Sequence, residues 1–170
     1  MSCVLIGGGS RSGKSRFALD YARRYAEPLA FIATAEARDE EMRARVAAHR
    51  ADRGLQFATI EEPIHIERAI EEAGSRYGAI VVDCLTLWLA NLMFASPKQD
   101  IARVTATLLR IASESPTVVV LVTNEVGCGI VPENALARQF RDLAGAMNQQ
   151  AAAAAQEAYW MVFGFPMRLK

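Results

Sequence analysis

The sequence predicts an α/β fold, a mostly parallel sheet flanked by helices, and three observations support this prediction. Short apolar runs rich in β-branched residues alternate with longer segments of helical periodicity. The first apolar run leads directly into a glycine-rich motif at residues 8–15, which is followed by a helical pattern. The chain has 170 residues, of which 52% are hydrophobic and 22% charged, so it is long enough to bury a sizeable core. We expect a single domain over residues 1–170.

The first predicted strand and helix enclose the glycine-rich motif. The strand covers residues 3–7, where Cys3-Val4-Leu5-Ile6 is a continuous apolar run. A helix begins directly after Ser15, and its Phe17 and Tyr21 lie four residues apart, hence on one face. A second apolar run predicts a strand at residues 29–33. The motif therefore has a strand before it and a helix after it.

An amphipathic helix is predicted over residues 39–53. Its Met42, Val46, His49 and Arg53 fall at steps of four, three and four, which places them on one face. Two of these residues are apolar and two are chemically reactive or charged, so this helix is also a candidate for function.

The rest of the chain continues the alternation. Strands are predicted at residues 79–83, 117–123 and 158–163, with a further short strand at Gln56-Phe57-Ala58-Thr59. The polar break at residues 96–100 begins a helix over residues 100–114, and a later helix, with Leu136, Phe140, Leu143 and Met147 on its apolar face, continues through the alanines at 151–155. Alternating elements of this kind predict a parallel sheet covered on both faces, with ligands at the carboxyl ends of its strands.

The glycine-rich motif is a phosphate-binding P-loop. Residues Gly8, Gly9, Ser10, Arg11, Ser12, Gly13, Lys14 and Ser15 match the pattern G-x-x-x-x-G-K-[ST]. Its glycines let successive backbone N–H groups curl around phosphate oxygens, Lys14 reaches the β and γ phosphates, and the Ser15 hydroxyl ligates Mg²⁺. The helix that follows adds the positive end of its dipole. The sequence predicts binding of a nucleoside triphosphate with Mg²⁺.

Polar residues follow three other predicted strands. Asp83 ends the strand at 79–83, where a carboxylate is suited to hold Mg²⁺ beside the nucleotide phosphates, although Asp in this position also caps helices. Thr34-Ala35-Glu36 follows the strand at 29–33. The loop at residues 124–129, Asn-Glu-Val-Gly-Cys-Gly, follows the strand at 117–123, and both ligand contact and a plain turn fit its composition.

His49 has two interpretations. A lone histidine on an amphipathic helix is usually a packed or surface residue. Arg50 and Arg53 flank this one, and two guanidiniums are able to grip a polyphosphate while an imidazole nitrogen attacks it. His65 lies between two isoleucines and has no arginine beside it, and we interpret it as structural.

Composition and charge limit the possible partners and compartment. Nineteen basic and nineteen acidic residues cancel, so no global field attracts nucleic acid or an anionic membrane. Cys3, Cys84 and Cys128 are widely spaced and odd in number, which we interpret as three buried thiols in a reducing compartment. The chain shows no targeting segment, and none of its apolar runs approaches the roughly 20 residues of a membrane span. We expect a cytoplasmic protein that binds no nucleic acid.

Taken together, these motifs resemble the bifunctional adenosylcobinamide kinase and adenosylcobinamide-phosphate guanylyltransferase family of cobalamin biosynthesis, essentially from end to end. Beyond the P-loop, the segments that carry the resemblance are residues 32–35, 39–42 with Arg45, His49 and Arg53, then 59–63, 83–88, 91–92, and 164–170. The most specific block is residues 123–134 followed by Ala137-Arg138, 140–142, Gly145 and Asn148-Gln149.

The resemblance implies two reactions on one chain. ATP or GTP phosphorylates the hydroxyl of the aminopropanol arm of adenosylcobinamide, and GTP then donates GMP through a histidine intermediate to give adenosylcobinamide-GDP. His49 corresponds to the guanylylated histidine, and Lys14 is the second catalytic residue. The implied nucleotide contacts are the P-loop together with Ala33, Thr34, Ala35, Arg50, Ala51, Asp52, Arg53, Glu61 and Asp83, and Ser15 and Asp83 are the implied Mg²⁺ ligands. The resemblance further implies a RecA-like P-loop NTPase fold and a homotrimer.

Two other functions remain to be weighed at this point. A simple P-loop kinase for a small molecule would leave His49 without a role. A GTP-binding switch protein would be expected to carry an Asn-Lys-x-Asp base-recognition motif, which the sequence lacks.

Overall fold

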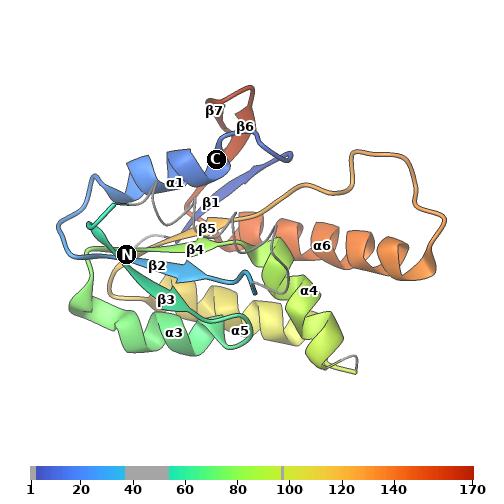
Figure 1. Ribbon diagram of the computed structural model, residues 1–170, viewed down its shortest axis with the longest axis horizontal. Helices are drawn as coiled ribbons and strands as arrows, with labels where there is room; N and C mark the ends of the chain where they lie inside the picture. The colour runs from blue at the N-terminus through green and yellow to red at the C-terminus, as the bar shows by residue number, and fades with distance from the viewer. Residues whose placement is uncertain (1–2, 37–53, 97) are drawn as a thin grey trace.

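The computed structural model describes residues 3–36, 54–96 and 98–170, and a seven-stranded sheet forms the centre of this part of the chain (Figure 1). The strands are β1 (Cys3–Gly8), β2 (Leu29–Ala33), β3 (Phe57–Glu61), β4 (Ala79–Asp83), β5 (Val118–Val122), β6 (Glu157–Val162) and β7 (Phe165–Arg168). They lie in the order β3-β2-β4-β5-β1-β6-β7, and all neighbouring pairs are parallel except β6 and β7. The predicted α/β fold with a mostly parallel sheet is confirmed.

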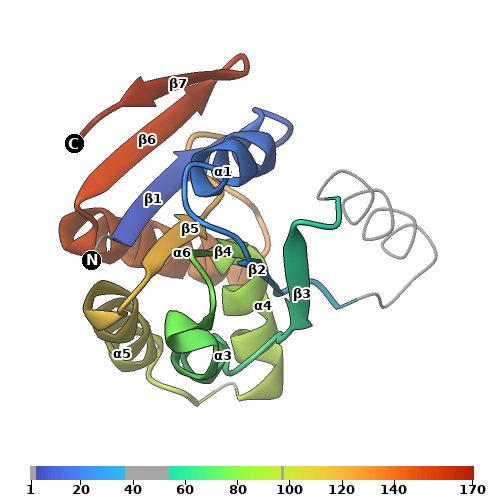
Figure 2. The same cartoon turned by 90° about the vertical axis from the view of Figure 1, so that its left-hand side faces the viewer.

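Helices cover both faces of the sheet, as predicted. On one face lies α1 (Lys14–Ala22), as Figure 2 shows. The other face carries α3 (Ile66–Ala73), α4 (Leu85–Ala95), α5 (Ile101–Glu114) and α6 (Ala135–Ala154), with the short 3₁₀ turn η1 (Gly74–Arg76) after α3. The helices predicted over 100–114 and through the alanine-rich segment are therefore present. The amphipathic helix predicted over 39–53 lies outside the described residues.

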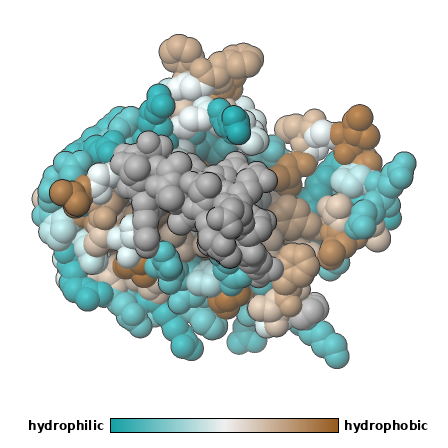
Figure 3. All heavy atoms as spheres, viewed as in Figure 1, coloured by the Kyte–Doolittle hydropathy of each residue, from teal (hydrophilic) through white to brown (hydrophobic). Residues whose placement is uncertain are grey.

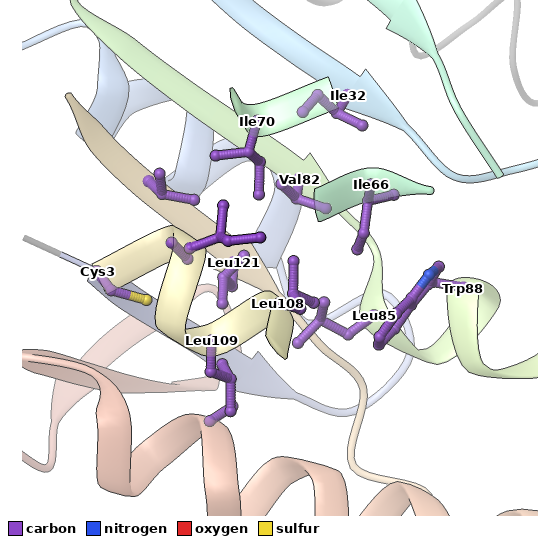
Figure 4. Packing of buried hydrophobic residues seen from close by; sticks show 14 of the residues in the cluster. Cys3, Ile32, Ile66, Ile70, Val82, Leu85, Trp88, Leu108, Leu109 and Leu121 are labelled. Atoms are coloured by element: carbon purple, nitrogen blue, oxygen red, sulfur yellow. The ribbon is translucent and has the colours of Figure 1, made fainter. Parts of the chain in front are cut away.

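Alternation along the strands divides the core between these two layers. In β1, Cys3 and Leu5 contribute to the larger cluster under α3, α4, α5 and α6, whereas Val4 and Ile6 contribute to the cluster under α1. Figure 4 shows residues of the larger cluster, with Trp88 of α4 at its side next to Leu85. The strands β1, β2, β4 and β5 thus bury both faces, which explains why they appear in the sequence as continuous apolar runs.

The strand β7 was not predicted from the sequence. It pairs only with β6, all four of its residues are exposed, and it contains Pro166, so it lacks the apolar pattern of a buried strand. The hairpin turn at Phe163 and Gly164 has positive φ at both residues, 51° and 85°. The sequence there is Phe-Gly rather than the usual Asn-Gly or Asp-Gly, which is why the hairpin signal was absent.

The expectation of three buried thiols is wrong for Cys128. Cys3 and Cys84 are buried, and burial raises the pKa of the Cys3 thiol to about 12 and that of Cys84 to about 11. Cys128 is exposed because it lies on the loop between β5 and α6, away from the sheet and its helices. Among the helices that the structure describes, none has the length and apolar character needed to cross a bilayer.

Gly78→Ala should lower the stability of the fold by about 2–3 kcal/mol, because a Cβ at this position would lie 1.9 Å from the carbonyl oxygen of Ala26 and the backbone would have to shift. The matched control is Gly145→Ala inside α6, where a Cβ meets no atom within 4 Å, and which should stabilise by about 0.5–1 kcal/mol. Urea unfolding of both variants checks the prediction. Equal stability of the two would contradict the packing at Gly78.

Candidate functional site

The register of the sheet brings the ends of five strands into one row at its carboxyl edge. Glu61 of β3 pairs with Ala33 of β2, which pairs with Asp83 of β4. Asp83 in turn pairs with Val122 of β5, whose neighbour in β1 is Ile6. Since the row spans four strand spacings, it is about 20 Å long. The predicted contacts Ala33, Glu61 and Asp83 are the last residues of their strands, and the P-loop and residues 34–35 follow at the same edge.

The P-loop forms the turn between β1 and α1. Gly13 is the N-cap of α1 with φ 95°, and Lys14 is the first residue of the helix. Gly8 has φ 150°, and a Cβ there would lie 2.9 Å from the carbonyl oxygen of Met161 in β6. Both positions therefore require glycine. The backbone N–H groups at the start of α1 are left for an anion, because no side chain caps this helix.

The side chain of Lys14 lies against the P-loop. The residue is 7% exposed, and its Nζ donates to the carbonyl oxygen of Gly9 at 2.5 Å, with the Ser12 hydroxyl at 3.4 Å. Burial lowers the pKa of Lys14, and the nearby negative charge of Asp83 acts in the opposite direction. The ammonium group and the Asp83 carboxylate therefore belong to one electrostatic site.

Asp83 ends β4 two strand spacings from β1, about 10 Å away across the sheet edge. The alternative interpretation, in which Asp83 caps the next helix, is not what the structure shows. Cys84 takes the N-cap position of α4, and it makes no side-chain cap hydrogen bond. The position of Asp83 therefore fits a carboxylate that faces bound phosphates and metal.

A pair of hydrogen bonds joins the residues that follow β2 and β4. The buried Thr34 hydroxyl donates to the carbonyl oxygen of Cys84 at 2.9 Å and accepts from the Cys84 N–H at 2.7 Å. The Thr34 N–H donates to the Asp83 carbonyl oxygen at 3.2 Å. Ala33 and Ala35, which flank Thr34, have side chains without polar atoms. Any contact of residues 33–35 with the nucleotide would thus come from the backbone, because the one polar side chain is bonded to Cys84.

The same edge holds a second set of polar side chains, buried or half-buried between β5, α4 and α6. Asn124 Nδ2 donates to the Thr86 hydroxyl at 2.9 Å, and the Asn124 N–H donates to the same oxygen at 3.1 Å. From α6, Asn148 accepts from the Thr123 hydroxyl at 2.6 Å and donates to the Asn124 carbonyl oxygen at 3.1 Å. The sequence indicated no role for the Thr86 and Asn148 side chains. Thr86 could have been noticed as a polar residue in the mostly apolar α4. Asn148 carries no comparable signal, because its partners at the end of β5 are distant in the sequence.

The loop after β5 is attached to the P-loop. The Glu125 N–H donates to the carbonyl oxygen of Gly8 at 3.1 Å, and the Glu125 carboxylate accepts from the N–H of Gly127 at 2.6 Å. The structure therefore shows a turn that its own carboxylate closes. The hairpin between β6 and β7 also contacts the P-loop, since the Gly164 N–H donates to the Ser12 carbonyl oxygen at 3.1 Å. The sequence did not predict this second contact.

Two of the remaining residues singled out in the sequence, Glu61 and His65, lie in the described part of the chain. Glu61 is exposed at the end of β3. His65 is exposed beside α3, with Nδ1 3.5 Å from a carboxylate oxygen of Glu67, which agrees with a structural role. His49, Arg50, Ala51, Asp52 and Arg53 fall outside the described residues, so their roles remain predictions.

The oxygen donors at the site suit Mg²⁺. This ion binds proteins through one or two oxygen side chains and takes its other ligands from substrate phosphates and water. Ser15 in the first turn of α1 and Asp83 at the end of β4 supply a hydroxyl and a carboxylate at the same sheet edge as Lys14. In the described part of the chain, no three His, Cys, Asp or Glu side chains form a metal-binding group.

Comparisons with known proteins identify relatives over almost the whole chain. The family model described as cobinamide kinase / cobinamide phosphate guanyltransferase matches residues 4–169. The bifunctional adenosylcobalamin biosynthesis protein CobP of Pseudomonas aeruginosa is 40% identical over 166 residues, 98% of this chain and 96% of that protein. The bifunctional adenosylcobalamin biosynthesis proteins CobU of Escherichia coli and Salmonella typhimurium are 38% and 40% identical over 180 residues, 98% of this chain and 99% of theirs.

Solved structures support the P-loop NTPase fold. An ATPase from a type III secretion system superimposes with a TM-score of 0.61 at 12% identity, covering 95% of this chain and 51% of that chain. The RadB recombinase superimposes with a TM-score of 0.53 at 13% identity, covering 94% of this chain and 73% of that chain. At these identities the likeness concerns the fold alone.

Proposed function

Because the chain belongs to the cobinamide kinase / cobinamide phosphate guanyltransferase family, we propose that it performs both reactions of that family on one polypeptide. The observation that carries the proposal is the match over residues 4–169 combined with a formed P-loop site at the carboxyl edge of the sheet. The substrates are adenosylcobinamide and a nucleoside triphosphate, ATP or GTP in the first step and GTP in the second.

In the first step, the hydroxyl oxygen of the aminopropanol arm attacks the γ-phosphorus, and the bond from that phosphorus to the β–γ bridging oxygen breaks. The nucleoside diphosphate leaves, and the hydroxyl proton passes to solvent or a nearby base. The start of α1 offers backbone N–H groups to the phosphates, and Lys14 adds a positive charge where the transferred group develops negative charge. Ser15 and Asp83 are the residues that would hold Mg²⁺, which when bound neutralises phosphate charge.

In the second step, an imidazole nitrogen of His49 attacks the α-phosphorus of GTP, and pyrophosphate leaves. The product is a phosphoramidate that carries GMP on the histidine. A phosphate oxygen of adenosylcobinamide phosphate then attacks the same phosphorus, and the bond between phosphorus and nitrogen breaks. This releases adenosylcobinamide-GDP and free His49. Arg50 and Arg53 are suited to hold the polyphosphate during the exchange.

Labelled GTP tests the two steps separately. Purified protein is incubated with Mg²⁺, adenosylcobinamide and GTP labelled at either the γ or the α phosphate. We expect γ label to appear first in adenosylcobinamide phosphate and α label to appear in adenosylcobinamide-GDP. Transfer of γ label alone would reduce the function to a P-loop kinase. Binding of GTP without transfer of either label would favour a switch protein.

A homotrimer in the cytoplasm completes the proposal. Apolar side chains gather on two projecting segments, the loop between β5 and α6 and the β6–β7 hairpin, at the right and top of Figure 3. Ile130 is 96% exposed on the loop, and Phe163 is 92% exposed on the hairpin. Exposed apolar patches of this kind commonly pack against another subunit. Sedimentation equilibrium should give three times the chain mass of 18.6 kDa. A monomer at micromolar concentration would contradict this assembly.

A further inference from the structure

We propose that Thr34 is a positioning residue: its hydroxyl holds the backbone directly after Asp83 and so fixes the direction of the Asp83 carboxylate toward Mg²⁺. The inference rests on the proposed function in that it takes Asp83 as the metal ligand. It gives Thr34 a different role from the direct nucleotide contact that the family resemblance implies, because the threonine acts through Cys84 rather than by its own contact with substrate.

Thr34 bonds to the backbone of Asp83 and of the residue that follows it, Cys84. Its hydroxyl both donates to and accepts from the backbone of Cys84, at 2.9 Å and 2.7 Å. Its own N–H donates to the Asp83 carbonyl oxygen at 3.2 Å. Three hydrogen bonds thus join one residue of the β2 loop to the end of β4. In this arrangement neither the Asp83 backbone nor that of Cys84 is able to rotate without breaking one of them.

The bonds to the Cys84 backbone require a hydroxyl at this buried position. Thr34 and Cys84 are 0% and 4% exposed, so water does not replace a lost bond at low cost. A hydroxyl donates and accepts at the same time, as the Cys84 carbonyl and N–H require. The Cys84 carbonyl also accepts from the Trp88 N–H within α4, but the Cys84 N–H has the Thr34 hydroxyl as its described acceptor. Loss of that hydroxyl would leave a buried N–H unpaired.

Asn91 extends the support from α4. Its Nδ2 donates to the Thr34 carbonyl oxygen at 2.8 Å and to the Pro63 carbonyl oxygen at 3.1 Å, and the residue is 8% exposed. This side chain is polar in a helix whose other buried residues are mostly apolar. Asn91 thereby holds the loop that carries Thr34 against α4. Groups that orient a metal ligand in this way typically alter metal affinity or activity by about 10–100-fold when they are replaced.

A second buried threonine provides a matched control. Thr105 in α5 is 1% exposed, and its hydroxyl has no hydrogen-bond partner within the described residues. Thr105→Val removes a buried hydroxyl of the same size without breaking a bond, so we expect stability that is equal or higher. Thr34→Val makes the same chemical change where the hydroxyl is bonded. Any difference between the two variants therefore reports the bonds to Cys84.

The experiment measures the affinity of full-length protein for the slowly hydrolysed analogue GTPγS by calorimetry, with Mg²⁺ and with EDTA. The variants are Thr34→Val, Thr34→Ala, Thr34→Ser, Thr105→Val and Asp83→Asn. For Thr34→Val and Thr34→Ala we expect the gain in affinity that Mg²⁺ confers to fall about tenfold or more, as in Asp83→Asn, while the affinity in EDTA stays within about twofold. Thr34→Ser keeps the hydroxyl and should retain the gain, as should Thr105→Val.

Each outcome decides the proposal independently of the corrinoid reaction. A wild-type Mg²⁺ gain in folded Thr34→Val or Thr34→Ala overturns it. Equal losses in Mg²⁺ and EDTA also overturn it, because they indicate a general role in binding or folding. If neither variant folds while Thr105→Val does, the bonds of Thr34 are structural and the proposal fails. Loss confined to the Mg²⁺ gain supports it, even if the wild-type protein transfers no phosphate to adenosylcobinamide, a result that would overturn the proposed function alone.

Discussion

Replacement of His49 by alanine is expected to abolish transfer of GMP while phosphorylation of adenosylcobinamide continues. The imidazole supplies the nitrogen that bonds to the α-phosphorus, and alanine has no nucleophile to replace it. The kinase step does not pass through that nitrogen, because the substrate hydroxyl attacks the γ-phosphorus directly. With GTP labelled at the α phosphate and without corrinoid, the parent protein should acquire label that is acid-labile and alkali-stable. The His49→Ala variant should acquire none.

His65→Ala is the matched control for this prediction, since it removes the chain's other histidine. His65 is exposed and lies 3.5 Å from Glu67, outside the P-loop site, so its loss should leave labelling unchanged. Label retained by His49→Ala would place the covalent intermediate on another residue. A parent that binds GTP and phosphorylates the corrinoid, yet acquires no label, would remove the guanylyltransferase half of the proposed function.

The sequence predicted where the P-loop lies between its strand and its helix, because the pattern is local. The P-loop is one contiguous segment, so its glycines, lysine and serine are adjacent in the sequence as well as in space. The sequence also predicted that Asp83 ends a buried strand, because an apolar run followed by a carboxylate is a local pattern. The sequence did not predict the order of the strands in the sheet. That order depends on pairings between distant segments, and hydrophobic periodicity carries no information about which strands are neighbours.

The polar network at the sheet edge shows what the sequence does not reveal. Thr34 was predicted as a nucleotide contact, and nothing in its neighbours indicates that its hydroxyl bonds to Cys84, fifty residues away. Asn91 and Asn148 are likewise polar residues on helices whose partners come from other elements. Their partners are set by tertiary packing, so the pattern marks such residues as unusual without saying what they hold. The contact between the β6–β7 hairpin and the P-loop was missed for a related reason, because the bond from Gly164 to Ser12 is purely backbone.

Lys14→Ala is expected to reduce both reactions, in contrast to the selective loss in His49→Ala. In the proposed function, the ammonium group of Lys14 stabilises the negative charge that develops on the transferred phosphate. Removal of one preorganised donor of this kind costs about 10²–10³-fold in turnover, or about 3–4 kcal/mol of barrier. The same loop holds GTP in the second step, so labelling of His49 should slow as well. Initial rates of both steps at saturating GTP measure the effect.

Urea unfolding of Lys14→Ala decides whether a loss of turnover comes from the missing ammonium group or from a destabilised fold. Lys14 is 7% exposed, and burial lowers its pKa, which means that the folded protein holds this charge at a desolvation cost. Alanine removes that cost together with the bond to Gly9, so Lys14→Ala should unfold at a urea concentration close to that of the parent. Lys98→Ala, which removes an exposed lysine after α4, should match the parent in both stability and rate. A Lys14→Ala protein with near-parent rates would show that the P-loop lysine does not act on the transferred phosphate. A large loss of stability would instead assign Lys14 to the fold.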